Sequence, residues 1–197
     1  MKMKKVNLNK KYWEKRYNND KANWNAGTIT PPLKFYIDQL RNKKIDILVL
    51  GTGHGHELHY LFQQGFKNIT GIDFTNQAAL QTAKEVSDFP LDKIVLGDFF
   101  EHVGEYDLIL EQTFFCSLPR GKRREYAEKI HGLLKKGGKL AGVLFDCEFD
   151  GEEPPYGGNK EEYEKLFSAS MTIKVLETAY NSIKPRSGRE LFVIIEK

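Results

Sequence analysis

Short apolar runs alternate along this chain with segments whose apolar residues recur at helical spacing. Runs that are short, rich in β-branched residues and bounded by turn residues predict strands. Such runs span residues 45–50, 68–73, 91–96, 106–111, 139–145, 171–178 and 190–195. Apolar positions three and four residues apart predict helices. The helical segments span residues 9–17, 33–40, 57–62, 76–86, 119–134 and 160–167.

The order of these segments indicates an α/β fold. The first five strands alternate with helices, as in a parallel sheet, whereas a loop joins the last two strands. We therefore expect a seven-stranded, mostly parallel sheet with helices on both faces and one antiparallel strand. Because 197 residues suit one domain, residues 1–197 are predicted to form a single domain, with residues 1–40 as an aromatic, helical leader.

Composition narrows the classes of partner. The chain is 40% hydrophobic and 29% charged, and its net charge of +3 is not the strongly basic balance of a nucleic-acid binder. Cys116 and Cys147 are too few for a disulfide framework and indicate free thiols in a reducing cytosol. No apolar run approaches membrane-spanning length, and no signal peptide is evident. We expect a cytoplasmic monomer with a small-molecule partner and no nucleic-acid or membrane partner.

The most informative stretch is the first strand and the glycines that follow it. Residues 45–50 lead into Gly51, Gly53 and Gly55, and a helix begins near Glu57. This order places backbone N–H groups and the positive end of a helix beside a ligand. Glycine also lets that ligand approach the backbone closely. The stretch therefore predicts a ligand site, although Gly-x-Gly alone is a weak signal.

Asp73 adds a second signal. It ends the second strand, twenty positions after Gly53, where a carboxylate can accept hydrogen bonds from ribose hydroxyls. The alternative is that Asp73 caps the helix that begins near Asn76. The dinucleotide fingerprint needs a small residue at its third glycine position, but His56 stands there. The pattern therefore favours S-adenosylmethionine, which has ribose and adenine but no phosphate.

Further candidates lie at strand ends and in the leader. Asp98 can accept from an adenine amino group and Phe99 can line the ring, although Asp98 is also a candidate helix or turn cap. Because parallel sheets bind ligands at the carboxyl ends of their strands, residues 111–115 are expected to border the site. Trp13 and Trp24 are candidates for a lid, since a sulfonium cation favours aromatic faces. The alternative is that both rings fill a surface groove.

Several motifs along the chain carry a resemblance to a known family. They are residues 12–17 (YWEKRY), 24–27 (WNAG), 50–57 (LGTGHGHE), 71–73 (GID), 97–100 (GDFF), 113–116 (TFFC), 133–138 (LLKKGG), 154–156 (PPY) and 186–190 (RSGRE). Together they resemble the thiopurine S-methyltransferase family in its broad sense, which includes the plant halide and thiol methyltransferases. The similarity covers nearly the whole chain.

The resemblance implies a Rossmann-like class I methyltransferase fold and S-adenosylmethionine as cofactor, with S-adenosylhomocysteine as product. The acceptor would be a small soft nucleophile: a thiol, thiopurine, sulfide, halide, or selenium or tellurium species. The implied cofactor-binding residues are Trp13, Tyr17, Trp24, Gly51, Gly53, Asp73, Phe74, Asp98, Phe99 and Glu111. The implied acceptor-binding residues are Tyr156, Arg186 and Gln112.

Departures from the family pattern leave the acceptor open. Gln112 stands where relatives often carry arginine or tyrosine, and the loop before Pro154 has two glutamates in place of small residues. Arg186 is a candidate for lowering the pKa of a thiol, or it is a surface loop arginine. We expect no metal, and no residue is assigned as a general base. The alternatives are an inactive regulatory module that binds S-adenosylmethionine and, from another class, an NAD-dependent oxidoreductase.

Overall fold

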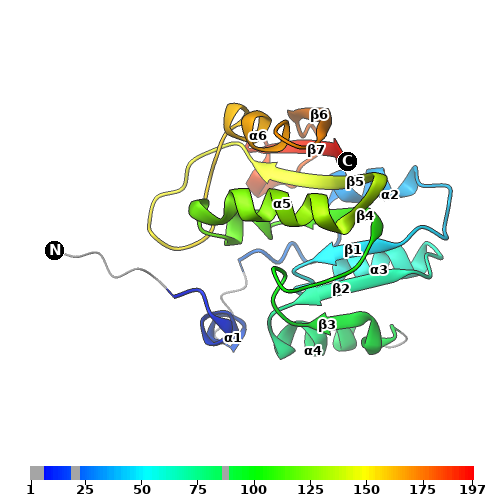
Figure 1. The fold of residues 1–197 in the computed structure, drawn as a ribbon. Helices are drawn as coiled ribbons and strands as arrows, with labels where there is room; N and C mark the ends of the chain where they lie inside the picture. Colours follow the sequence, from blue (N-terminus) through cyan, green and yellow to red (C-terminus); the bar gives the residue numbers. More distant parts are fainter. Residues whose placement is uncertain (1–6, 19–22, 86–88) are drawn as a thin grey trace.

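Residues 7–18, 23–85 and 89–197 are described by the computed structural model of the chain, whose fold is shown in Figure 1. The strands are β1 (Ile47–Leu50), β2 (Ile69–Asp73), β3 (Ile94–Leu96), β4 (Tyr106–Gln112), β5 (Leu134–Phe145), β6 (Thr172–Thr178) and β7 (Glu190–Glu196). The helices are α1 (Lys10–Asn18), α2 (Pro31–Asp38), α3 (His56–Gln63), α4 (Asn76–Glu85), α5 (Arg123–Leu133) and α6 (Lys160–Phe167). Short 3-10 turns are η1 (Leu91–Lys93), η2 (Phe115–Ser117), η3 (Arg120–Lys122) and η4 (Lys184–Arg186).

The strands form one sheet in the order β3-β2-β1-β4-β5-β7-β6. β1 to β5 pair in parallel, and β7 runs antiparallel to both β5 and β6. This confirms the predicted mostly parallel sheet with one antiparallel strand. The strand order reverses between β1 and β4, and open α/β sheets bind ligands at the carboxyl ends of the strands beside such a reversal. In Figure 1 these ends point to the left, towards α1.

Side chains of β1 alternate between the two halves of the core. Ile47 and Val49 pack in the cluster that includes the buried residues of α2 and α3. Leu48 and Leu50 pack in the cluster that includes α5 and α6 on the other face. Because successive side chains of a strand point to opposite faces, a strand covered on both faces is apolar at every position. The unbroken aliphatic run is thus explained by helices on both faces of the sheet.

Gly137 and Gly138 follow a predicted helix, and glycines at that position usually cap the helix end. The structure shows that they do not cap α5, so the cap expected from the sequence is wrong. α5 passes directly into β5. Gly137 has a φ of 77°, and the register of the β4–β5 pairing shifts between Tyr106 and Leu108. A Cβ on Gly138 would lie 2.8 Å from the carbonyl oxygen of Tyr106. The two glycines therefore form a bulge inside the strand.

Other element boundaries differ less from those predicted. Segment 91–96 opens with η1, so that only its last three residues form β3. Segment 119–134 opens with η3 before α5 begins. The predicted end of the helix at residue 86 lies outside the described residues. Within the ranges that the structure describes, no helix is long and apolar enough to cross a membrane.

The cap of α6 offers a test of the local structure. The Asn159 side chain accepts a hydrogen bond from the backbone N–H of Glu162 at 2.9 Å. We expect Asn159→Ala to lower the free energy of unfolding by about 1 kcal/mol, because one N–H at the helix start loses its acceptor. Asn159→Ser keeps an acceptor and should stay close to the parent. Urea unfolding measures both, and equal stability of all three proteins would contradict the role of this cap.

Candidate active site

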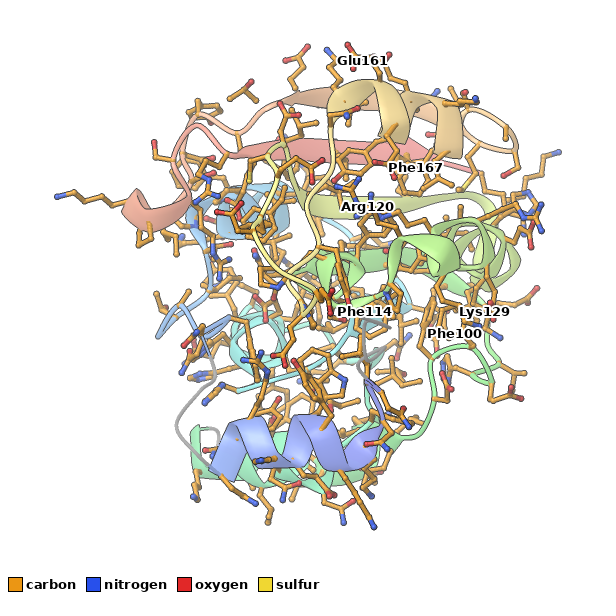
Figure 2. All side chains as sticks on the ribbon, turned by 90° about the vertical axis from the view of Figure 1, so that its left-hand side faces the viewer. Phe100, Phe114, Arg120, Lys129, Glu161 and Phe167 are labelled. Carbon is orange, nitrogen blue, oxygen red and sulfur yellow. The ribbon has the colours of Figure 1, made fainter. Side chains whose placement is uncertain are left out.

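A cavity of about 330 Å³ lies at the carboxyl ends of β1, β2 and β4. Residues of the glycine turn after β1, the end of β2 and the turn after β4 form one side of it. α1, residues 23 and 24, the loop after β5 and the segment 185–189 form the other side. Figure 2 looks onto this end of the sheet, with Phe114 of the cavity wall labelled above α1. The cavity is therefore at the place where the strand order predicts a ligand site.

The predicted glycine turn is confirmed. Gly51, Gly53 and Gly55 have φ angles of 58°, 56° and 78°, which side chains rarely tolerate. A Cβ on Gly51 would lie 2.8 Å from Cδ2 of Phe114. A Cβ on Gly53 would lie 3.6 Å from Nε1 of Trp24. Glycine is thus needed for the backbone conformation and, at Gly51, for close packing against the turn after β4.

Asp73 lines the cavity and holds the glycine turn. Its Oδ2 accepts from the N–H of Gly53 at 3.3 Å, and its Oδ1 accepts from N and Oγ1 of Thr75 at 2.9 Å each. Burial raises the pKa of Asp73, and the hydrogen bonds from Thr75 and Gly53 oppose that rise. The helix α4 is capped by Thr75, whose Oγ1 accepts from Ala78 N. The capping alternative for Asp73 is therefore wrong, and its contact with ribose stays a prediction.

Three aromatic residues of the leader line the cavity: Trp13, Tyr17 and Trp24. The Trp24 ring centroid lies 5.8 Å from that of Trp13 and 5.2 Å from that of Tyr17, both edge-on. Burial and the nearby negative charge of Asp73 raise the pKa of Tyr17. Phe74, from the end of β2, lines the same cavity. The structure thus brings these rings together over the glycine turn, as a lid requires.

A polar clasp joins α1 to the loop after β5. Arg16 Nη2 donates to Glu153 Oε2 at 2.8 Å, and the Tyr12 hydroxyl donates to the same oxygen at 3.1 Å. Arg16 Nε also donates to the Tyr12 hydroxyl oxygen at 2.9 Å. Pro154 and Pro155, which follow Glu153, line the cavity with Arg16. The unusual glutamate of the loop therefore holds the leader across the mouth of the cavity.

Arg186 is buried, so the surface-loop alternative is wrong. It is 8% exposed, and Nη2 donates to the carbonyl oxygen of Trp24 at 2.8 Å. Nη1 lies 3.6 Å from Glu190 Oε1 and has no hydrogen-bond partner among the described residues. Gln112 lines the same cavity; its Oε1 accepts from the Thr30 hydroxyl at 2.7 Å, and its Nε2 is unpartnered in the same part of the chain.

Glu111 lies behind the cavity wall and is fully buried. Its Oε1 accepts from the N–H groups of Phe114 and Phe115 at 2.8 and 2.9 Å, and its Oε2 accepts from the Tyr126 hydroxyl at 2.8 Å. Burial raises the pKa of Glu111 to about 7, and these hydrogen bonds oppose the rise. The carboxylate thus holds the turn after β4 and does not itself line the cavity.

Three other predicted residues also lie outside the lining of the cavity. Asp98 is exposed and accepts from the N–H of Phe100 at 2.9 Å, as in a turn. Phe99 is 3% exposed and packs edge-on against Phe114, with ring centroids 5.2 Å apart. The Tyr156 hydroxyl donates to the carbonyl oxygen of Glu152 at 3.0 Å. The adenine roles of Asp98 and Phe99 and the acceptor role of Tyr156 stay predictions.

The cavity also contains residues that the sequence did not single out. They are Arg16, Asn23, Cys116, Ser117, Phe145, Phe149, Pro154, Pro155, Pro185 and Arg189. Most come from loops, where no periodic pattern indicates direction. Arg16 had a signal, because it lies four residues after Tyr12 on one helix face. Across the described ranges, no three His, Cys, Asp or Glu side chains gather in a way that could hold a metal ion.

Comparison with known proteins decides the family. The family model of thiopurine S-methyltransferase matches residues 8–194. The chain belongs to the thiopurine S-methyltransferase family. It is therefore an S-adenosylmethionine-dependent methyltransferase, and the oxidoreductase alternative is wrong.

Curated relatives of this methyltransferase are distant in sequence but similar in extent. The probable thiol methyltransferase 2 of Arabidopsis thaliana is 28% identical over 185 residues, covering 90% of this chain and 81% of the relative. The thiopurine S-methyltransferase of Vibrio vulnificus (strain YJ016) is 27% identical over 164 residues, covering 77% and 72%. Both alignments span most of each chain.

Solved structures confirm the Rossmann-like methyltransferase fold. The 1,6-didemethyltoxoflavin-N1-methyltransferase of Burkholderia thailandensis, solved with S-adenosylhomocysteine, has a TM-score of 0.74 at 19% identity and covers 95% of this chain and 86% of its own. A TehB-like SAM-dependent methyltransferase of Corynebacterium glutamicum has a TM-score of 0.67 at 19% identity, covering 95% and 97%. At these identities the likeness supports the fold alone.

Asp73 provides a test of the cofactor site of the methyltransferase. We expect Asp73→Ala to weaken S-adenosylmethionine binding by roughly 1–3 kcal/mol, because charged hydrogen bonds to ribose are lost. Calorimetric titration measures the affinity. Thr75→Val removes one hydrogen bond to the same carboxylate and serves as the control, with an expected loss in stability and little loss in affinity. Equal losses of affinity would mean that Asp73 only holds the turn, and unchanged affinity in folded Asp73→Ala would remove it from the site.

The clasp between α1 and the loop provides a second test. Arg16 and Glu153 have side chains 20% and 54% exposed, and such ion pairs contribute about 0–1 kcal/mol. We expect Glu153→Gln to speed S-adenosylhomocysteine dissociation up to about fivefold at low salt, and less at high salt. Stopped-flow measurement gives the rate. Glu152→Gln is the control, since that side chain forms no ion pair among the described residues; equal rates in both variants would contradict the clasp.

Proposed function

We propose that this methyltransferase acts on a small, soft nucleophile that reacts as an anion. Thiols are the first candidates, and thiopurines, sulfide, halides and selenium or tellurium species share the same chemistry. The observation that carries the proposal is the buried guanidinium of Arg186 on the cavity wall, whose Nη1 has no hydrogen-bond partner within the described part of the chain. The names of the thiol and thiopurine methyltransferase relatives support this class of acceptor.

Arg186 suits an anionic acceptor. Its Nη1 forms an ion pair with Glu190 at 3.6 Å but no hydrogen bond within the described part of the chain, and an anion in the cavity would add a second partner for the guanidinium. A nearby positive charge also lowers the pKa of a thiol and raises the fraction present as thiolate. The amide Nε2 of Gln112 is a second unpartnered donor of a cavity residue. Together these groups favour a small anion over a neutral acceptor.

The lining of the cavity offers no base for a neutral acceptor. Asp73 is the only carboxylate among the described lining residues, and no histidine lines the cavity in that part of the chain. Both oxygens of Asp73 already accept hydrogen bonds. An amine or alcohol would need a group to take its proton, whereas a thiolate or halide would not. Burial raises the pKa of the Cys116 thiol, so this cavity residue stays protonated and does not compete as a nucleophile.

The volume of the cavity and its apolar lining also favour a small, soft anion as the acceptor. Its volume of about 330 Å³ is near the lower end of the range of ligand pockets, roughly 300–1,000 Å³. The cofactor must occupy most of that space, which leaves room for a small acceptor. Phe145, Phe149, Pro154 and Pro155 make the loop side apolar. Loss of water around a soft anion would increase its reactivity.

The residues of this chain would act by positioning. When bound, S-adenosylmethionine would supply a methyl group activated by a positively charged sulfur. Asp73, which lines the cavity, would orient the ribose. The rings of Trp13 and Trp24, which also line the cavity, would cover the cofactor and exclude water. Arg186 would hold the acceptor anion in line for displacement, where orientation contributes most of the acceleration. We also propose that the protein is a cytoplasmic monomer without a membrane partner. A net charge of only +3 supports the absence of a nucleic-acid partner.

An acceptor screen tests this function. The purified protein is incubated with S-adenosylmethionine and with thiols, thiopurines, halides, selenite or tellurite, and with a catechol and a primary amine as comparison acceptors. Mass spectrometry should find methylated thiols, and the rate should rise with pH as the thiolate fraction increases. Methylation of only the amine or catechol would overturn the proposal. Cofactor binding without any product would favour the regulatory module.

Arg186→Met tests the residue that carries the proposal. We expect kcat/KM for thiols to fall by about tenfold to a hundredfold, since a hydrogen bond to a charged group contributes about 1.5–3 kcal/mol. Arg189→Met is the matched control, because Arg189 also lines the cavity but is exposed. Its Cζ lies 4.9 Å from the ring centroid of Phe149. Its loss should cost less than about fivefold. Equal effects of the two substitutions would contradict the special role of Arg186.

A further inference from the structure

The turn that follows β4 supplies much of the cavity wall. Gln112, Thr113, Phe114, Cys116 and Ser117 all line the cavity. Thr113 has a φ of 60°, the left-handed region that residues with a side chain rarely adopt. Such a conformation persists only where the surroundings fix it, and it is often found at functional sites. The wall therefore needs an anchor that holds this strained turn.

Glu111 and Tyr126 form that anchor. Both are fully buried. One carboxylate oxygen of Glu111 accepts from the consecutive N–H groups of Phe114 and Phe115, and the other accepts from the Tyr126 hydroxyl. The N–H groups have lost the sheet ladder where β4 ends, so without the carboxylate they would be buried and unpaired. Tyr126 comes from α5 and fixes the direction of the carboxylate.

The anchored turn controls both sides of the cavity. Phe114 packs so closely on the glycine turn that a Cβ on Gly51 would lie 2.8 Å from its Cδ2. The carbonyl oxygen of Cys116 accepts from the N–H of Tyr156 at 2.7 Å, which ties the Pro154–Pro155 loop to the same turn. A shift of the turn would therefore move the wall beside the glycines and the loop beside the acceptor together.

We propose that Glu111 is a positioning residue for methyl transfer: its carboxylate, oriented by Tyr126, fixes the strained turn that sets Phe114 against the glycine turn and Gln112 in the cavity wall. It acts through the turn and does not touch the cofactor or the acceptor. The proposal rests on the proposed function only for its kinetic readout, because the anchoring itself is a property of the fold.

Substitutions of Glu111 separate positioning from contact. Glu111→Ala should reduce kcat by about tenfold to a hundredfold, because a small displacement of reacting groups has effects of that size. KM for S-adenosylmethionine should change by less than about threefold, since the cofactor keeps its own contacts. Glu111→Gln should restore kcat to within about threefold of the parent, because its amide oxygen accepts the two N–H groups and its amide nitrogen can donate to Tyr126.

A pair of tyrosine variants provides the matched control. Tyr126→Phe removes the hydroxyl that orients Glu111 and should lower kcat. Tyr106→Phe removes a similar hydroxyl, paired with His102 at 2.8 Å at the opposite end of β4. It should leave kcat unchanged even where it lowers the temperature of unfolding. Equal loss of kcat in both tyrosine variants would overturn the proposal, as would parental kcat in Glu111→Ala or a Gln variant as impaired as the Ala variant.

Hydrogen exchange keeps the test independent of the acceptor. Exchange of the amides of residues 112–117 should be faster in Tyr126→Phe than in the parent or in Tyr106→Phe, because the anchored N–H groups open more often. If the parent protein methylates no acceptor, the proposed function is wrong. The hydrogen-exchange measurement still tests whether Glu111 and Tyr126 anchor the turn. If Glu111→Ala does not fold, the Gln and tyrosine variants decide. Unchanged exchange in Tyr126→Phe would overturn the proposal.

Discussion

Turns at the carboxyl ends of parallel strands leave backbone N–H groups without ladder partners, and the whole site depends on how these groups are satisfied. Two buried carboxylates do most of this. Asp73 accepts from the glycine turn and from Thr75, and Glu111 accepts from Phe114 and Phe115. Burial raises the pKa of both carboxyl groups, which shows that burying their negative charge is unfavourable. The hydrogen bonds that they accept hold the two turns in place. A buried carboxylate that accepts backbone N–H groups therefore holds each side of the cavity, on β2 and on β4, the two strands that flank β1.

The cover of the cavity is held differently, by contacts between segments far apart in sequence. Arg186 joins the segment before β7 to the carbonyl oxygen of Trp24, and Arg16 joins α1 to Glu153. The exposure of the side chains to water indicates which of the two contacts is more stabilising. Arg186 is 8% exposed, so its charged hydrogen bond is shielded from water. The side chains of Arg16 and Glu153 are 20% and 54% exposed, so their ion pair contributes only about 0–1 kcal/mol.

Much of the fold was predictable because its signals are local. The apolar run of β1, the glycines after it and the acid at the end of β2 each follow from a few neighbouring residues. The sequence prediction was wrong where a contact with a residue distant in sequence determines the local structure. Gly137 and Gly138 form a bulge because β4 approaches them. Asp98 accepts a hydrogen bond within its own turn and lies outside the lining of the cavity, and its adenine role stays a prediction. Loop residues such as Phe149 and Arg189 line the cavity, and no periodic pattern in the sequence predicts this. The acceptor role predicted for Arg186 came from the family resemblance, because no local pattern indicates it.

Gln112 changes the balance of charge at the acceptor end. Its side chain is a neutral amide whose oxygen accepts a hydrogen bond from the Thr30 hydroxyl. Arg186 is then the buried cation of the described lining, 3.6 Å from the buried carboxylate of Glu190, while Arg16 pairs with Glu153 and Arg189 is exposed. One buried charge with one amide donor matches a single small anion better than a large ring with several polar groups. Under the proposed function, the amide of Gln112 would favour simple thiolates and similar anions as acceptors.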